Sequence, residues 1–150
     1  MTRFVTTLSF VAALTAISAT PALAQDGGVR GGISVDPDQF YFGGHIETSP
    51  LVDRLHFRPN VEVGLGEDLM LIGANMEFVY KFPSTGGWNF YAGAGPALNV
   101  IMIDDQDDSN VEAGFNVLVG VESPRGLFFE FKVGAIDSPD FKFGVGYTWR

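Results

Sequence analysis

The most constraining feature of the sequence is an alternation of apolar and polar residues with a period of two, which is clearest over residues 142–150. Successive side chains of a strand point to opposite faces, so this pattern predicts a β-strand with one apolar and one polar face. The apolar face would carry Phe143, Val145, Tyr147 and Trp149. The opposite face would carry Lys142, Gly144, Gly146, Thr148 and Arg150.

The same period runs through almost the whole chain after residue 24. Turn residues divide it into eight predicted strands, near 29–35, 39–48, 55–66, 69–82, 88–102, 111–122, 127–135 and 141–150. Most of these segments reach the length at which a tilted strand crosses a bilayer. No segment after residue 24 has the three-to-four-residue apolar spacing of an amphipathic helix, so the pattern predicts one all-β domain.

The first 24 residues have a different composition. Arg3 precedes a long apolar run that ends in the small-residue sequence Pro21-Ala22-Leu23-Ala24. This order is typical of a secretory signal peptide, so we predict that 1–24 is removed and that 25–150 is the folded domain. The alternative is a membrane anchor, for which the run is barely long enough. The sequence has no cysteine, which excludes disulfides, a lipoprotein anchor and thiol chemistry.

The polar faces of the predicted strands carry both signs of charge in balance. The basic side chains are Arg30, Arg58, Lys81, Lys132, Lys142 and Arg150, and the acidic ones are Glu47, Glu62, Glu77, Glu112, Glu122 and Glu130. A narrow, water-poor interior requires such balance, because an unpaired buried charge is costly. We therefore predict an interior charge network of Arg58, Glu62, Glu77, Lys81, Glu112, Glu122, Glu130, Lys132 and Lys142. The alternative is the solvated surface of a soluble sheet.

Acidic residues concentrate in every second predicted connection. The first, third, fifth and seventh connections contain no Lys or Arg and carry Asp36, Asp38, Glu67, Asp68, Asp104, Asp105, Asp107, Asp108, Asp137 and Asp140. The other connections carry Asp53, Arg54 and Arg125. Alternate turns share one end only when strands run up and down in sequence, so the distribution predicts a meander that closes into a barrel.

Several residues refine this prediction. Pro59 and Pro96 each remove a hydrogen-bond donor from a barrel without edges, so we expect a bulge or broken pairing at both. Four apolar residues fall on the nominal inner face, Leu69, Leu71, Leu118 and Phe128. Five outward aromatic residues near one end would form an interfacial girdle, Tyr80, Phe82, Trp88, Tyr147 and Trp149.

The C-terminal strand also resembles the assembly signal of bacterial outer-membrane β-barrels, in the spacing of Lys142, Gly144, Tyr147 and Trp149. Segments 88–97 and 114–122 look like those of small outer-membrane β-barrel (porin-family) proteins. The resemblance implies an eight-stranded transmembrane barrel in the Gram-negative outer membrane. It implies outer-membrane lipid, lipopolysaccharide and the barrel-assembly machinery as partners. Arg150 follows Trp149 here, whereas the family usually ends on the aromatic residue.

Few residues suggest catalysis. His45 and His56 are predicted on inner faces near Glu47 and Arg58, where a His–Glu pair could act as a base or hold a metal. We favour the interpretation that both histidines belong to a hydrogen-bonded interior. We predict no catalytic residue and no cofactor. The acidic net charge of −9 argues against nucleic acid as a partner.

The acidic loop at 104–110 is a weak candidate cation site. Its carboxylates, those of Asp104, Asp105, Asp107 and Asp108, are hard oxygen ligands suited to Ca²⁺ or Mg²⁺. A solvated loop is the interpretation that we favour. The predicted function is a structural or surface-interaction role for a barrel with a filled interior. The alternatives are a soluble periplasmic barrel that binds an apolar ligand and a lipid-acting enzyme that uses His45 or His56.

Overall fold

The protein forms a closed eight-stranded barrel in which every strand is antiparallel to both neighbours. The computed structural model describes residues 25–36, 38–84, 86–103, 109–136 and 141–150, so the predicted signal peptide and residues 104–108 lie outside the described residues. The strands are β1 (Gln25–Val35), β2 (Gln39–Thr48), β3 (Leu55–Leu65), β4 (Leu69–Lys81), β5 (Asn89–Ile103), β6 (Ser109–Glu122), β7 (Leu127–Ala135) and β8 (Phe141–Thr148).

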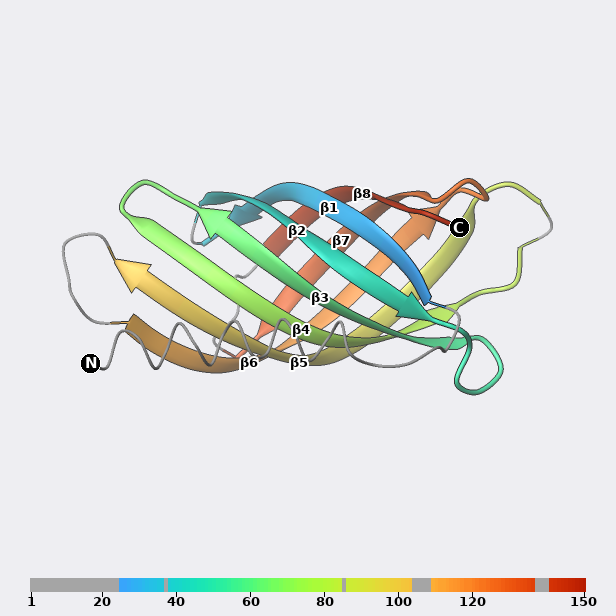
Figure 1. Cartoon of the computed structure of the whole chain (residues 1–150), viewed down its shortest axis with the longest axis horizontal. Helices are drawn as coiled ribbons and strands as arrows, with labels where there is room; N and C mark the ends of the chain where they lie inside the picture. Colours follow the sequence, from blue (N-terminus) through green and yellow to red (C-terminus); the bar gives the residue numbers. More distant parts are fainter. Residues whose placement is uncertain (1–24, 37, 85, 104–108, 137–140) are drawn as a thin grey trace.

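The first and last strands close the sheet. β1 and β8 pair from Gly28–Thr148 to Val35–Phe141, and each other strand pairs with its neighbours in sequence (Figure 1). The predicted all-β, up-and-down barrel is therefore confirmed. Among the described residues, no helix is long and apolar enough to cross a membrane.

The strand bounds differ from the predicted ones by a few residues at the ends. β1 begins at Gln25 rather than near 29, because Gly27 and Gly28 pair with Ile46 and His45 of β2. Glycine carries no side chain that could have contributed to the alternating pattern. The backbone pairing therefore extends further than the side-chain periodicity.

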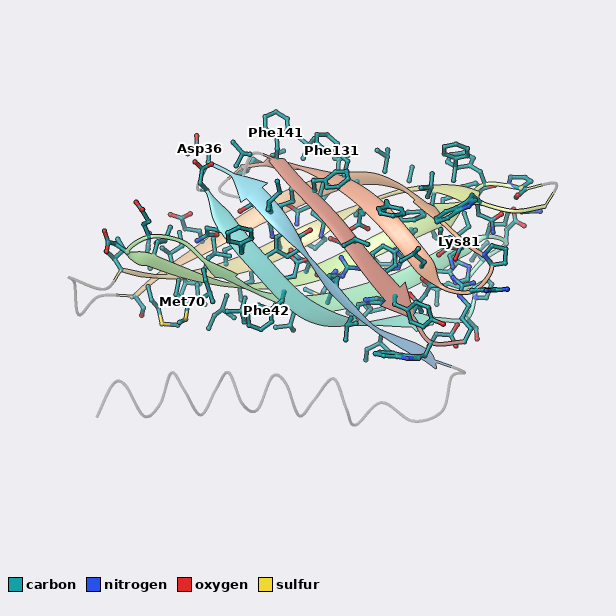
Figure 2. The ribbon with its side chains drawn as sticks, turned by 90° about the horizontal axis from the view of Figure 1, so that it is seen from above. Asp36, Phe42, Met70, Lys81, Phe131 and Phe141 are labelled. Carbon is teal, nitrogen blue, oxygen red and sulfur yellow. The ribbon has the colours of Figure 1, made fainter. Side chains whose placement is uncertain are left out.

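The two faces of the sheet are opposite to those of a water-soluble barrel. On β8, Phe143 and Val145 are 54% and 43% exposed, as is Trp149 directly after the strand at 56%, whereas Lys142 and Thr148 are buried. Figure 2 shows the rings of Phe131 and Phe141 pointing away from the barrel wall. Large apolar side chains thus cover the outer wall, and polar side chains fill the interior.

The up-and-down order also determines which connections share an end. The β1–β2 and β3–β4 connections lie at the same end, and there they carry the acidic residues Asp36, Asp38, Glu67 and Asp68. Asp36 and Lys81 lie at opposite ends of the barrel in Figure 2. The remaining acidic residues of this set, within 104–108 and 137–140, lie outside the described residues.

Pro59 marks the point at which one ladder stops. The β2–β3 pairing runs from Phe40–Leu65 to His45–Asn60 and ends there, one residue before Pro59. On its other side Pro59 remains paired with Met76. The expected disturbance is therefore a broken pairing on one side, without a bulge.

Pro96 interrupts the β4–β5 ladder in a similar way. Pairing stops after Asn75–Ala97 and resumes at Phe78–Ala94, in the same register. An extra residue would have shifted the register, so this site is also a broken pairing and not a bulge. Both prolines are accommodated by giving up contacts with one neighbouring strand.

Inward aromatic rings occupy the space above glycines. Tyr91 lies opposite Gly120, and a Cβ at this glycine would overlap the Tyr91 ring. Tyr41 reaches across Gly32 of β1, so that its hydroxyl occupies the place of a Cβ at Gly144. Gly144 of the predicted assembly signal is therefore also required by the packing of the barrel interior.

We predict that Gly144→Ala lowers the free energy of unfolding by about 1–3 kcal/mol, the usual cost of overpacking. Because the closest atom is the Tyr41 hydroxyl, adding Tyr41→Phe should restore part of the loss. Urea titration of the detergent-folded barrel measures both changes. Gly44→Ala on the outer face is the matched control, since its nearest neighbour is at an ordinary 3.6 Å. An equal loss in this control would contradict the assignment.

Candidate functional site

The interior charge network is the candidate functional site, and Arg58 lies at its centre. The Arg58 side chain is fully buried, and its Nε and Nη2 donate to Glu47 Oε2 at 2.8 and 2.5 Å. The same guanidinium lies 3.6 Å from Glu122 and 3.7 Å from Glu130, and 4.7 Å from the centre of the Tyr91 ring. Arg58 therefore ties β3 to β2, β5, β6 and β7.

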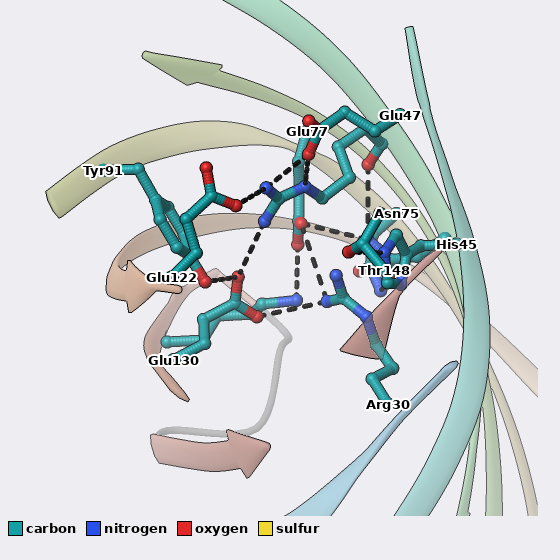
Figure 3. A network of polar contacts seen from close by, with 12 residues as sticks. Arg30, His45, Glu47, Asn75, Glu77, Tyr91, Glu122, Glu130 and Thr148 are labelled. Atoms are coloured by element: carbon teal, nitrogen blue, oxygen red, sulfur yellow. Dashed lines mark hydrogen bonds and ion pairs between the residues drawn. The ribbon is translucent and has the colours of Figure 1, made fainter. Parts of the chain in front are cut away.

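A second group of charges joins the remaining strands. Lys142 of β8 donates to Glu62 Oε2 at 2.6 Å, and Lys132 of β7 pairs with both Glu62 and Glu77. Arg30 of β1 donates to Glu130 at 3.1 Å and to Glu62 at 3.4 Å. These contacts join strands on opposite walls, so the charged side chains are the core of the barrel. Figure 3 shows Glu77, Glu122 and Glu130 approaching the centre from different strands.

A chain of side-chain amides extends the network. Asn75 Nδ2 donates to Asn60 Oδ1 at 2.8 Å, and Asn116 Nδ2 donates to Asn75 Oδ1 at 2.8 Å. Asn60 in turn donates to Glu77 Oε2 at 2.9 Å. The chain passes over β5, where Gly95 faces Asn116 without a side chain in the way. The amides are buried, and each has a hydrogen-bond partner within the chain.

The interior also contains one apolar cluster. Val79, Tyr91, Leu118 and Phe128 are each at most 1% exposed and pack together. The Phe128 ring centre lies 5.4 Å from the Arg30 guanidinium carbon and 5.6 Å from that of Arg58. Leu118 and Phe128, which the sequence places on the inner face, thus form part of the packing around the buried cations. Cations over aromatic faces are favourable when desolvated.

The structure brings together most, but not all, of the residues predicted for the network. Lys81 contacts Glu47 and lies 2.9 Å from Glu122, at the end of the barrel where β4 finishes. Glu112 is not part of the network. It accepts a hydrogen bond from Asn110 at 3.0 Å near the other end of β6. Glu112 and Glu122 share a face but lie roughly 33 Å apart along the strand. Alternation gives the face of a residue, whereas the partners that it meets on other strands depend on the register between strands.

Other residues belong to the network although the predicted set omitted them. Arg30 and Glu47 are central to it, and Arg150 Nη2 lies 2.8 Å from Glu122 at the barrel mouth. Their positions on the polar faces were the signal that could have included them. Tyr91 also belongs to the network, because its hydroxyl donates to Glu130 at 3.2 Å. The sequence did not indicate this, because the alternation of polar and apolar residues is weaker on β5.

The residues of the predicted assembly signal divide between the two faces of β8. Lys142 and Gly144 point inward, toward Glu62 and Tyr41 respectively. Tyr147 and Trp149 point outward, with their ring centres 5.9 Å apart in an edge-on arrangement. The same strand therefore contributes to the interior network and to the outer aromatic surface.

The two histidines do not meet. His45 Nε2 lies 2.9 Å from Thr148 Oγ1, and His56 Nδ1 lies 2.8 Å from the Thr48 carbonyl oxygen and 3.8 Å from Glu47. The His45–Thr148 pair was not predicted, because it joins β2 to β8 across β1. The Thr148 side chain is fully buried. A buried imidazole and hydroxyl can hold two strands together, but this pair has no exposed surface for a substrate.

No site for a metal is found in the part of the chain that the structure describes, since no three His, Asp or Glu side chains gather suitably there. The weak cation candidates Asp104, Asp105, Asp107 and Asp108 lie outside the described residues. The described chemistry is therefore that of paired charges and hydrogen-bonded amides.

A closed eight-stranded meander with an apolar outer wall and a charged interior is the fold of the transmembrane β-barrels. Solved structures with this fold include the N-terminal β-barrel domain of Pseudomonas aeruginosa OprF, at 16% identity and a TM-score of 0.64 over 83% of this chain and 96% of that one. Neisserial surface protein A (NspA) is similar at 15% identity and a TM-score of 0.67, over 83% and 94% of the two chains.

The outer membrane enzyme PagL is also similar, at 12% identity and a TM-score of 0.52, over 85% of this chain and 99% of its own. No protein-family model and no curated protein sequence matches the chain. At these identities the likeness establishes the fold. One of these three proteins, PagL, is an enzyme.

We predict that Arg58→Met lowers the free energy of unfolding by about 3–5 kcal/mol, because it leaves buried carboxylates without their partner. Arg54→Met is the matched control, since Arg54 is exposed in the connection before β3. This control should change the free energy by less than about 0.5 kcal/mol. Urea unfolding of both variants in the same detergent measures the difference. Similar small effects of the two substitutions would show that the network does not hold the barrel together.

Proposed function

We propose that this chain is an outer-membrane protein whose barrel spans the bilayer and has a structural or surface-interaction role. The observation that carries the proposal is the distribution of side chains over the two faces of a closed sheet. The outer wall exposes Phe40, Phe42 and Phe143 by 74%, 57% and 54%. A soluble protein rarely leaves such a continuous apolar surface in water, whereas lipid acyl chains cover it without cost.

The aromatic residues support a defined position in the membrane. Tyr80, Phe82, Trp88, Tyr147 and Trp149 are 36–56% exposed. They belong to the end of the barrel where β4 finishes, β5 begins and β8 ends. Aromatic side chains with a polar atom prefer the boundary between headgroups and acyl chains. This end would lie at the inner, periplasmic boundary, and the acidic end would face outward.

The filled interior supports a role other than transport. Lys132 pairs with Glu62 and Glu77 inside the bore. Arg58 pairs there with Glu47, Glu122 and Glu130. These buried side chains fill the bore, so the barrel is closed by its own interior. Removal of residues 1–24 on export and recognition of β8 by the barrel-assembly machinery complete the proposal. Outer-membrane lipid and lipopolysaccharide are then the surroundings of the apolar wall.

A lipid-acting enzyme is the second candidate, because PagL has the same fold and His45 lies within hydrogen-bond distance of a hydroxyl. The burial of Thr148 argues against it. A lipid substrate reaches a barrel from its outer wall, and this pair faces the interior. We therefore assign the pair a structural role.

Depth-dependent substitution tests the proposed membrane insertion. Val117→Arg should lower the free energy of unfolding in phospholipid vesicles by about 2–4 kcal/mol, because Val117 lies midway along β6 on the outer wall. Val111→Arg should cost about 0–1 kcal/mol, because Val111 lies near the end of the same strand on the same face. Unfolding followed by tryptophan fluorescence measures both. A soluble barrel would tolerate both substitutions, and equal costs at the two positions would contradict insertion in this orientation.

Epitope insertion tests the proposed orientation. An epitope between Glu67 and Asp68, in the β3–β4 connection, should bind antibody on intact cells. One beside Ser84, in the β4–β5 connection, should bind only after the outer membrane is permeabilised. Whole-cell antibody labelling reads out both. The reverse pattern would invert the barrel, and release of the protein by osmotic shock would favour the soluble alternative.

A further inference from the structure

We propose that the connection between β2 and β3, residues 49–54, is a second membrane contact whose apolar tip enters the headgroup region of the phospholipid leaflet around the barrel. The tip consists of Leu51 and Val52. The inference rests on the proposed function, because it requires the barrel wall to lie in a bilayer. It adds a lipid-binding element outside the strands.

The tip is apolar and exposed. Leu51 is 47% exposed and Val52 is 72% exposed, compared with 49% for Val29 on the barrel wall. The neighbouring connection at the same end, between β4 and β5, has Ser84, Gly86 and Gly87 at its centre, where this one has leucine and valine. Burial of these two side chains in lipid would remove their apolar surface from water.

The connection between β2 and β3 runs in a different direction from its neighbour between β4 and β5. Figure 1 shows the chain between β2 and β3 turning sideways, away from the long axis of the molecule. The connection between β4 and β5 instead extends along that axis in the same view. A sideways turn at the end of a membrane barrel meets the headgroup layer, whereas an axial one extends into water.

Backbone contacts hold the tip in this position. Leu51 N donates to Leu55 O at 2.8 Å, and Leu55 N donates to Val52 O at 2.9 Å. Asp53 adopts a left-handed conformation with φ 53°, which completes the tight turn. The Arg54 carbonyl accepts a hydrogen bond from Lys81 N at 3.1 Å, which ties the connection to the end of β4. The connection is thus a folded unit that presents two apolar side chains.

The tip adjoins the aromatic surface described above. Leu55 pairs with Tyr80, and the Tyr80 ring packs edge-on against Phe82 at 5.3 Å. Asp53 and Arg54 cancel in charge, so apolar burial would carry the contact and anionic lipid would not be required. The Arg54 side chain can remain at the level of the phosphates while the tip lies deeper. The occupant is therefore the zwitterionic phospholipid interface.

A single-cysteine fluorescence experiment tests the contact, since the chain has no native cysteine. Val52→Cys carries an environment-sensitive dye in protein folded into phosphatidylcholine vesicles, with potassium iodide on both sides of the membrane. We expect blue-shifted emission, quenching by lipids with a nitroxide near the headgroup, and protection from iodide. Ser84→Cys with the same dye is the aqueous control, and Phe143→Cys is the control for the lipid-facing wall.

A further variant separates contact by the protein from insertion of the dye itself. Adding Leu51→Asp to Val52→Cys should shift the emission to the red and restore iodide quenching at least severalfold. If the Val52 label behaves like the Ser84 label while the Phe143 label is in lipid, the proposed contact of the tip is overturned and membrane insertion of the barrel stands. If Leu51→Asp leaves the Val52 label protected, the dye and not the tip holds it in lipid. If the Phe143 label is also aqueous, the proposed membrane function fails.

Discussion

The structure depends on the pairing of charges inside a closed sheet. A barrel of eight strands leaves a bore that side chains must fill, and the apolar side chains of this chain are committed to the outer wall. The polar faces therefore form the core. Arg58 is fully buried there and Arg30 is 5% exposed, and each lies against more than one carboxylate. An interior of this kind holds together only when nearly every charge has a partner.

The amides and aromatic rings make this charged core possible. The Asn60–Asn75–Asn116 chain fills space between carboxylates without adding charge, and Phe128 provides an apolar surface against two guanidinium groups. Glycines let large inward rings lie close to the backbone of neighbouring strands. The number of glycines in the sequence thus reflects packing of the interior as much as the turns.

The last strand combines these requirements. β8 closes the sheet by pairing with β1, while Lys142 and Thr148 join it to β3 and β2 through the interior. Tyr147, near the end of β8, belongs together with Trp149 to the aromatic surface at one end of the barrel. Arg150, a departure from the usual terminal pattern, lies against Glu122 at the mouth and so adds a partner to the network. One strand therefore serves closure, core and outer wall together.

The sequence alone determined the strands, the two faces and the up-and-down order, because a period of two and alternating acidic turns are local properties of an extended chain. Only the tertiary structure decided which inward residues meet. Glu112 shares a face with Glu122 but meets Asn110 and not the buried cations, and His45 reaches Thr148 across an intervening strand. The sideways direction of residues 49–54 was likewise not readable from the sequence. Height, contacts across the bore and loop direction depend on strand tilt and register, which no local pattern encodes.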